Sequence, residues 1–132
     1  MNDEVKKLSQ HRLDRAKRSF AEAQSLLANG FLEGAVNRFY YAAFYSAKAL
    51  LATKDLDSSK HSGIISLFNE HFVKTKLIDK EKAKALSHSF EERQDTDYED
   101  FISITKQEVE SLQREVQDFL QECLRVLQNL KS

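Results

Sequence analysis

Proline is absent from this chain of 132 residues, and glycine occurs only three times. Because sharp backbone reversals rely on these two residues, a fold rich in β-hairpins is disfavoured and an all-helical fold is favoured. A chain of this length is expected to form one domain, residues 1–132, and to bury enough surface to fold without disulfides.

Cysteine and long apolar runs are also scarce. Cys123 is the only cysteine, which excludes an internal disulfide and suits a reducing cytosol. No segment approaches the roughly 18 apolar residues of a membrane span, and the first ten residues, MNDEVKKLSQ, lack a long apolar run. We therefore predict a cytoplasmic protein without a membrane segment.

The chain has no excess of either charge, since 20 Lys and Arg residues accompany 21 Asp and Glu residues. Its composition does not indicate a polyanion-binding protein, so any binding of nucleic acid would depend on a local patch or pocket. One basic stretch lies near the beginning of the chain. It contains Lys6, Lys7, His11, Arg12, Arg15, Lys17 and Arg18. A solvated helix face is its usual interpretation, and contact with RNA phosphates or an acidic partner is the alternative.

Apolar residues recur at steps of three and four along most of the chain, which is the spacing of amphipathic helices. The pattern predicts a first helix over residues 3–29, with Asn29 and Gly30 at its C-terminal cap. A second helix is predicted over residues 32–53. It is apolar around most of its circumference, so we expect it to be the central helix.

Three more helices are predicted after a polar connection. A short helix over residues 62–74 has Ser62 as its cap, and Asp79 caps a fourth helix. Thr105 and Glu108 form a capping-box pattern before the last helix. The apolar seam of that helix is expected to pack either on its own bundle or on a second subunit. The seam contains Val109, Leu112, Val116, Phe119, Cys123, Val126 and Leu130. The expected fold class is all-α, an antiparallel up-and-down bundle of four main helices plus one short helix.

Two charged residues continue the apolar stripe of the fourth helix. At about 100° per residue, Arg93 and Asp97 fall on the same arc as the apolar residues before them. An inward-facing charge is costly unless it is paired or opens into a cleft. Arg93 and Asp97 could therefore pair with each other, or Arg93 could bind an anion such as phosphate in a cleft that Tyr98 lines.

Asn37 is a second polar residue at an interior-looking position, on the predicted central helix. It shares a face with Tyr41, Phe44 and Lys48, and it would need a hydrogen-bond partner if buried. A backbone group could satisfy it, or it could form a pocket together with Arg93. The aromatic residues of this helix are Phe39, Tyr40, Tyr41, Phe44 and Tyr45. Such a run could stack on bases, although bundle core and a dimer interface are its more usual roles.

The histidines do not have the spacing of metal ligands. His61, His71 and His88 form no H-x-x-x-H pair and have no cysteine partner, so we predict surface or cap positions and no metal or other cofactor. Lys60 and His61 stand next to the start of the third helix, where free N–H groups could bind an anion. Capping by Ser62 is the simpler interpretation of that segment.

Three segments carry a resemblance to a known family. They are AVNRFYYAAFYSAKALL, KHSGIISLFNEHFVKTKLI and FEERQDTDYED, and their order and spacing extend over nearly the whole chain. Together they resemble the HEPN superfamily, specifically its small stand-alone proteins of the UPF0332 type. The resemblance implies a helical bundle that forms a homodimer and a frequent partnership with a minimal nucleotidyltransferase. It also implies, for many members, metal-independent RNase activity or a toxin role in toxin–antitoxin pairs.

The resemblance places Arg93 at the arginine of the family's catalytic motif, in which a histidine follows four to six residues later at the dimer cleft. No histidine occupies that window here, and Tyr98 stands where a four-residue gap would place it. Arg93 could stabilise a charged phosphorane. A base for the 2′-hydroxyl proton is missing, because tyrosine ionises near pH 10 and Arg93 would keep Asp97 weakly basic.

Two classes of function follow. In the first, the protein is the HEPN half of a nucleotidyltransferase pair and binds nucleotide or RNA through Asn37, Tyr41 and Arg93, with Arg93, Asp97 and Tyr98 as candidate catalytic residues. In the second, it is a non-catalytic dimeric adaptor that docks the nucleotidyltransferase or presents its substrate. The resemblance also implies that the transferase of some pairs modifies a tyrosine near this motif, which makes Tyr98 a candidate target.

Overall fold

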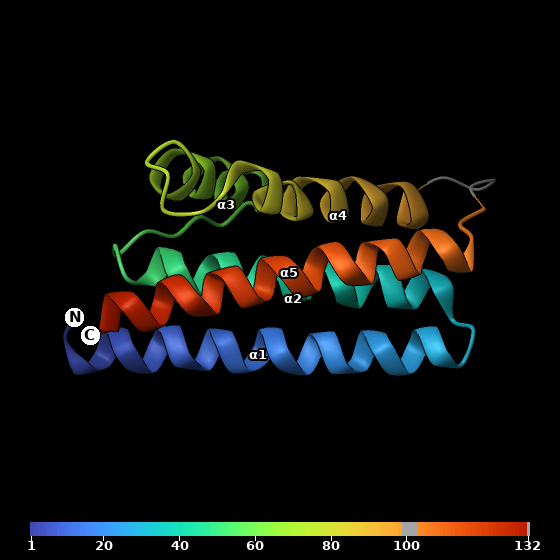
Figure 1. Ribbon diagram of the computed structural model, residues 1–132, viewed down its shortest axis with the longest axis horizontal. Coiled ribbons are helices and arrows are strands. Elements are labelled where there is room, and N and C mark those ends of the chain that lie inside the picture. The colour runs from blue at the N-terminus through green and yellow to red at the C-terminus, as the bar shows by residue number, and fades with distance from the viewer. Residues whose placement is uncertain (99–102, 132) are drawn as a thin grey trace.

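The computed structural model describes residues 1–98 and 103–131, and in these ranges every regular element is helical. The elements are α1 (Asp3–Ala28), α2 (Leu32–Ala52), α3 (His61–Phe68), the π-helical turn η1 (Asn69–Val73), α4 (Lys80–Tyr98) and α5 (Lys106–Lys131). The four long helices run alternately up and down, and both termini lie at the same end (Figure 1). The predicted all-α bundle of four main helices and one short helix is confirmed.

Local capping signals set several helix ends. Gly30 follows α1 with a φ of 80°, a left-handed conformation that glycine adopts without strain. The capping box of α5 forms as predicted, since the Glu108 N–H donates to Thr105 Oγ1 at 3.1 Å and the Thr105 N–H donates to Glu108 Oε1 at 3.3 Å. Before α4, Asp79 Oδ2 accepts the N–H of Lys82 at 3.3 Å. These ends are where the sequence predicted them.

The start of α3 differs from the prediction. The helix begins at His61 with Lys60 at its N-cap, so Ser62 lies within the first turn and is not the cap. Ser58 orders the preceding loop instead, because its Oγ accepts the N–H of Lys60 at 3.2 Å. Gly63 allows this loop to approach, since a Cβ at that position would clash with Ser58 Oγ.

The central position predicted for α2 is confirmed, because this helix packs against α1, α3, α4 and α5. The apolar seam of α5 packs on its own bundle, mainly on α2 and α4, which answers the question that the sequence left open. From Val109 to Val126 the seam residues are at most 4% exposed, and only Leu130, at 36%, reaches the surface. None of the described helices is long and apolar enough to cross a membrane.

Candidate functional site

Arg93 lies in the last turns of α4 with its side chain 18% exposed. Its Nε donates a hydrogen bond to Asp97 Oδ2 at 3.1 Å, so the pairing that the sequence allowed is present. The guanidinium carbon also lies 5.4 Å from the ring centroids of both Tyr40 and Tyr41 on α2. Within the described chain, the terminal nitrogens of Arg93 make no hydrogen bond, and neither is sealed from solvent. The guanidinium is therefore oriented by its neighbours and still has donors available.

A histidine from a different helix joins this region. His61 stacks on Phe44 with 4.4 Å between ring centroids and 14° between ring planes. Its Nδ1 lies 2.5 Å from the hydroxyl oxygen of Tyr40, a residue that is fully buried. It also contacts Tyr41 edge-on, at 5.9 Å between centroids. His61 is the first residue of α3 and only partly buried, near the helix start where a surface or cap position was predicted, and its ring packs on the aromatic cluster of α2.

Cations and aromatic rings alternate over one side of α2, and we call this surface the cation–aromatic face. Its members are Arg15, Arg38, Tyr41, Tyr45, Lys48, His61 and Arg93. The guanidinium carbon of Arg15 lies 4.2 Å from the Tyr45 ring centroid, and that of Arg38 lies 4.9 Å from the Tyr41 centroid. Both tyrosines are half-buried, so part of each remains accessible. Rings interleaved with cations are typical of surfaces that bind single-stranded nucleic acid.

The charges around this face set the protonation of its polar groups. Burial lowers the pKa of His61, and the positive charges of Arg93 and Lys48 lower it further, so the imidazole is neutral at pH 7. Burial also raises the pKa of the Tyr40 hydroxyl well above its usual value, so this group keeps its proton. In the loop before α3, Asp57 pairs with Lys48 at 3.6 Å. The face therefore carries its positive charge on arginine and lysine and not on histidine.

The structure brings some predicted site residues together and separates others. Tyr41 and Asp97 both contact Arg93. Asn37 is only half-buried, contrary to the interior position expected for it, and no hydrogen bond joins it to Arg93 in the described chain. Tyr98 is 73% exposed at the end of α4, so its ring does not line a cleft beside Arg93. The roles proposed for Asn37 and Tyr98 stay predictions.

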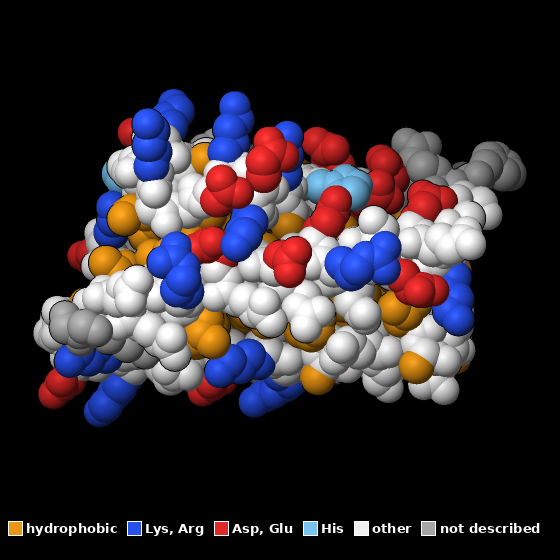
Figure 2. Space-filling model, in the orientation of Figure 1, with side chains coloured by type: hydrophobic (Ala, Val, Ile, Leu, Met, Phe, Trp, Pro, Cys, Tyr) orange, Lys and Arg blue, Asp and Glu red, His pale blue; other side chains and the backbone are white. Residues whose placement is uncertain are grey.

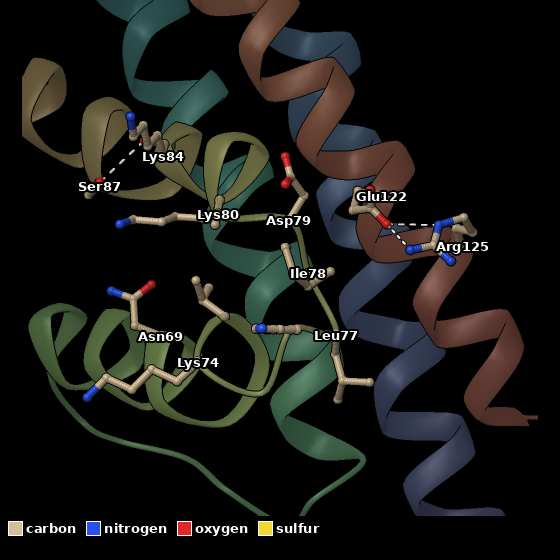
Figure 3. Close-up of a pocket in the computed structure, with 13 residues that line it drawn as sticks. Asn69, Lys74, Leu77, Ile78, Asp79, Lys80, Lys84, Ser87, Glu122 and Arg125 are labelled. Carbon is tan, nitrogen blue, oxygen red and sulfur yellow. Dashed lines mark hydrogen bonds and ion pairs between the residues drawn. The ribbon is translucent and has the colours of Figure 1, made fainter.

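A cavity of about 820 Å³ lies away from the predicted site, between η1, the beginning of α4 and α5 (Figure 3). Five of its lining residues are basic, namely Lys74, Lys76, Lys80, Lys84 and Arg125. Its buried acid, Glu122, accepts hydrogen bonds from Arg125 and forms an ion pair with Lys82 at 3.1 Å. Burial would raise the pKa of Glu122, but these partners outweigh it and hold the pKa below its usual range. Because Arg93 does not line this cavity, the two regions are separate.

His88, on α4, has surroundings opposite to those of His61. Its Nδ1 lies 2.6 Å from Glu115 Oε2, and its Nε2 lies 3.3 Å from Glu92 Oε1. Burial would lower its pKa, but the hydrogen bonds and negative charges of the two carboxylates outweigh this and raise it. Figure 2 shows a histidine among acidic side chains over α4 and α5. In the described residues, no three His, Cys, Asp or Glu side chains gather as metal ligands.

Comparison with known proteins supports the resemblance seen in the sequence. The HEPN domain family matches residues 9–127 of the chain. A UPF0332 protein of Thermotoga maritima is 37% identical over 98% of both chains. Two proteins of Methanocaldococcus jannaschii, each named as a candidate toxin, are 35% and 32% identical. The match to the first of these covers 87% of this chain and 78% of the relative. The match to the second covers 98% of this chain and 96% of the relative.

The family match begins at residue 9, in the first half of α1, and ends at residue 127, near the end of α5, so it includes every helix that contributes to the cation–aromatic face. The match and the relatives that cover nearly the whole chain agree with the all-helical bundle. This chain belongs to the HEPN domain family, among relatives that include UPF0332 proteins and candidate toxins.

Proposed function

We propose that the protein binds a nucleotide or RNA on the cation–aromatic face around Arg93, and that it does so as the toxin-like half of a nucleotidyltransferase pair. One observation carries the proposal. The Arg93 guanidinium is held by Asp97 and by two tyrosine rings, and its terminal N–H groups are left for a ligand. Phosphate is the anion that such a fork recognises best, through paired hydrogen bonds.

The rest of the face suits the other parts of a nucleotide. Tyr41 and Tyr45 are half-buried, and a base stacked on such a ring contributes about 1–3 kcal/mol. Arg15 and Arg38 lie over these rings and would meet neighbouring phosphates of a longer chain. Most of the binding free energy would then be sensitive to salt, as expected when cations replace the counterions of a phosphate backbone.

Binding without cleavage follows from the groups next to Arg93. The Asp97 carboxylate is already engaged with the Arg93 guanidinium through its Oδ2. Tyr98 points into solvent, and the Tyr40 hydroxyl holds its proton because burial raises its pKa. None of the three is suited to accept the 2′-hydroxyl proton of RNA at neutral pH.

Tyr98 supports the partner in this proposal. The residue is 73% exposed, and it is the last residue of α4. An enzyme that transfers a nucleotidyl group to a tyrosine needs such an accessible hydroxyl, so Tyr98 is the residue that a nucleotidyltransferase would modify. The same exposure favours the second candidate function, a non-catalytic adaptor that docks this partner at the end of α4. Mass spectrometry of the protein after incubation with the transferase and ATP would distinguish modification from docking alone.

Fluorescence anisotropy with a labelled short single-stranded RNA tests the binding function, with adenosine monophosphate as competitor. Replacement of Arg93 by alanine is expected to weaken binding about tenfold, which corresponds to about 1.4 kcal/mol. Lys84→Ala is the matched control, because it removes a cation from the same helix at the separate cavity. Circular dichroism establishes that both variants are folded. Equal binding by the wild type and Arg93→Ala would contradict the proposal.

A cleavage assay without metal ions completes the test. Neither the wild type nor Arg93→Ala is expected to degrade the RNA. Cleavage that is lost in folded Arg93→Ala would show that Arg93 is catalytic and that another group on the face accepts the proton.

A further inference from the structure

The contact between His61 and Tyr40 determines which ring nitrogen of His61 carries a proton. Tyr40 is fully buried, and its hydroxyl has one hydrogen-bond partner in the described residues, His61 Nδ1 at 2.5 Å. A buried O–H that donated to nothing would cost about 1–3 kcal/mol. The Tyr40 hydroxyl must therefore donate, and Nδ1 must accept. In a neutral imidazole the proton is then on Nε2.

The Nε2–H group of His61 has no partner within the described part of the chain, yet it is not sealed from solvent. The ring cannot turn away from this arrangement, because it is stacked on Phe44 and fixed at Nδ1 by Tyr40. The donor is therefore held in one direction before any ligand arrives. This is the preorganisation that makes a single hydrogen bond effective in binding.

His61 and Arg93 pack against the same two tyrosine rings. The centroid of His61 lies 5.6 Å from that of Tyr40 and 5.9 Å from that of Tyr41. The guanidinium carbon of Arg93 lies 5.4 Å from each of the same centroids. Two donors that no protein group in the described residues uses thus pack on the same pair of tyrosine rings, and the charge of Arg93 is felt at His61. One comes from α3 and the other from α4.

We propose that His61 is a second phosphate-binding residue of this face, donating a neutral hydrogen bond from Nε2–H to the phosphate ester that Arg93 holds. The inference rests on the proposed function, and it names the chemistry of the ligand as a nucleotide phosphate. His61 supplies direction without charge, and Arg93 supplies the charge. Tyr40 is a positioning residue, because it acts on the ligand only through the tautomer of His61.

This assignment also bears on the absent catalytic histidine. His61 comes from another helix and is close to Arg93, but Nε2 already carries a proton and cannot accept one from a 2′-hydroxyl. Nδ1 is blocked by Tyr40. The face therefore has a histidine beside its arginine and lacks the base that cleavage needs, in agreement with binding as the proposed activity.

Nitrogen NMR of the imidazole tests the tautomer without any ligand. In the wild type at pH 7.5, the long-range proton–nitrogen spectrum is expected to show Nδ1 of His61 unprotonated and Nε2 protonated. Tyr40→Phe removes the donor to Nδ1, and a mixture of the two tautomers is expected in that variant. A protonated Nδ1 in the wild type, or an unchanged tautomer in folded Tyr40→Phe, would overturn the assignment.

Binding measurements test the role of the donor, with adenosine monophosphate and a short single-stranded RNA as separate probes. His61→Ala is expected to weaken binding of both about tenfold, and His61→Gln to recover part of the loss, because its amide N–H reaches a similar position. His88→Ala, which removes a histidine outside the face, is expected to bind as the wild type does. Circular dichroism and thermal unfolding identify any variant that fails to fold. If His61→Ala fails to fold, the binding of His61→Gln is compared with that of the wild type instead.

The outcomes separate this inference from the proposed function. Binding that is weakened by Arg93→Ala but unchanged in His61→Ala and His61→Gln overturns the role of His61 and leaves the proposed function in place. A wild-type protein that binds neither probe overturns both. Weaker binding by His61→Ala, together with partly restored binding by His61→Gln, supports the neutral hydrogen-bond donor. Tighter binding of RNA than of the mononucleotide would identify the polymer as the source of the phosphate.

Discussion

His61 and His88 are both partly exposed, and their surroundings are opposite in character. His61 lies among aromatic rings with Arg93 and Lys48 as its charged neighbours, and its pKa is lowered. His88 lies between two glutamates, and its pKa is raised. The comparison shows that neighbours from other helices, which spacing along the chain does not reveal, decide whether a histidine here is a neutral donor or a cation.

The two histidines make opposite contributions to the dependence of stability on pH. For His61 the folded-state pKa is below that of the unfolded chain, so its contribution is present above about pH 6.5 and is lost as the pH falls. For His88 the folded-state pKa is above that of the unfolded chain. Its contribution is present below about pH 6.5 and is lost as the pH rises through the folded value.

Phe44→Ala should have the largest effect, because it removes the ring on which His61 stacks. Phe44 is 7% exposed, and truncation of a buried phenylalanine costs about 3–5 kcal/mol. Water entering the space should also bring the pKa of His61 back toward its usual value. Denaturant unfolding measures the first effect, and an NMR titration measures the second with His88 as internal control. A His61 pKa that stays low would show that the stacked ring is not what lowers it.

Tyr40→Phe should have the next largest effect, a loss of about 1 kcal/mol in the free energy of unfolding. The change keeps the ring and leaves Nδ1 of His61 without its partner. Tyr45→Phe is the matched control, since it removes a half-buried hydroxyl that bonds to none of the described residues. Chemical denaturation measures the free energy of unfolding of the wild type, Tyr40→Phe and Tyr45→Phe. Equal stability of the two variants would mean that the contact between Tyr40 and His61 contributes nothing.

His61→Gln should change the response to acid by less than about 1 kcal/mol. The wild type must protonate His61 against burial and against the charges of Arg93 and Lys48 when the pH falls below about 6.5. Asp97 is paired with Arg93, and Asp57 is paired with Lys48. Glutamine does not titrate, so the variant should lose less stability between pH 7.5 and pH 5.5. Thermal unfolding at both pH values measures the difference. If the wild type and His61→Gln lost the same stability between pH 7.5 and pH 5.5, His61 would be excluded as the source of the acid sensitivity.

Glu115→Gln should have the smallest effect, about 0.2–0.5 kcal/mol at pH 6, because the pair with His88 is at the surface. The effect should vanish at pH 9, where His88 is neutral. Unfolding at the two pH values measures it, and added salt should reduce it at pH 6. If Glu115→Gln lost the same amount of stability at both pH values, the loss would be due to packing and not to charge.

Much of the fold follows from patterns that are local in the chain. The stripes of α1 and α5, the capping box at Thr105 and Glu108, and the cap at Asp79 depend on residues within a few turns of one another. The pairing of Arg93 with Asp97 belongs to the same class, because residues four apart on a helix are neighbours in any helix. These predictions needed no knowledge of how the helices pack.

Where local signals competed, the prediction was less accurate. Ser62 has the residue type of a cap, but α3 begins at His61 because the loop carrying Ser58 closes over Gly63. Asn37 looked interior because it shares a face of α2 with apolar residues, but that face is only partly covered by the neighbouring helices. In both cases the packing of another segment decided the outcome.

The sequence by itself determined that this chain is a bundle of helices that resembles the HEPN family, with Arg93 and Asp97 four residues apart on one helix and no histidine after them. Those properties depend on the spacing of apolar residues and on neighbours within a helix. Only the tertiary structure decided that His61 and Arg93 pack on the same ring, that of Tyr40, and that Nδ1 of His61 is bonded to the Tyr40 hydroxyl. The physical reason is that this contact depends on how α3 and α4 pack on α2, and residues far apart in sequence carry no local signal of their approach.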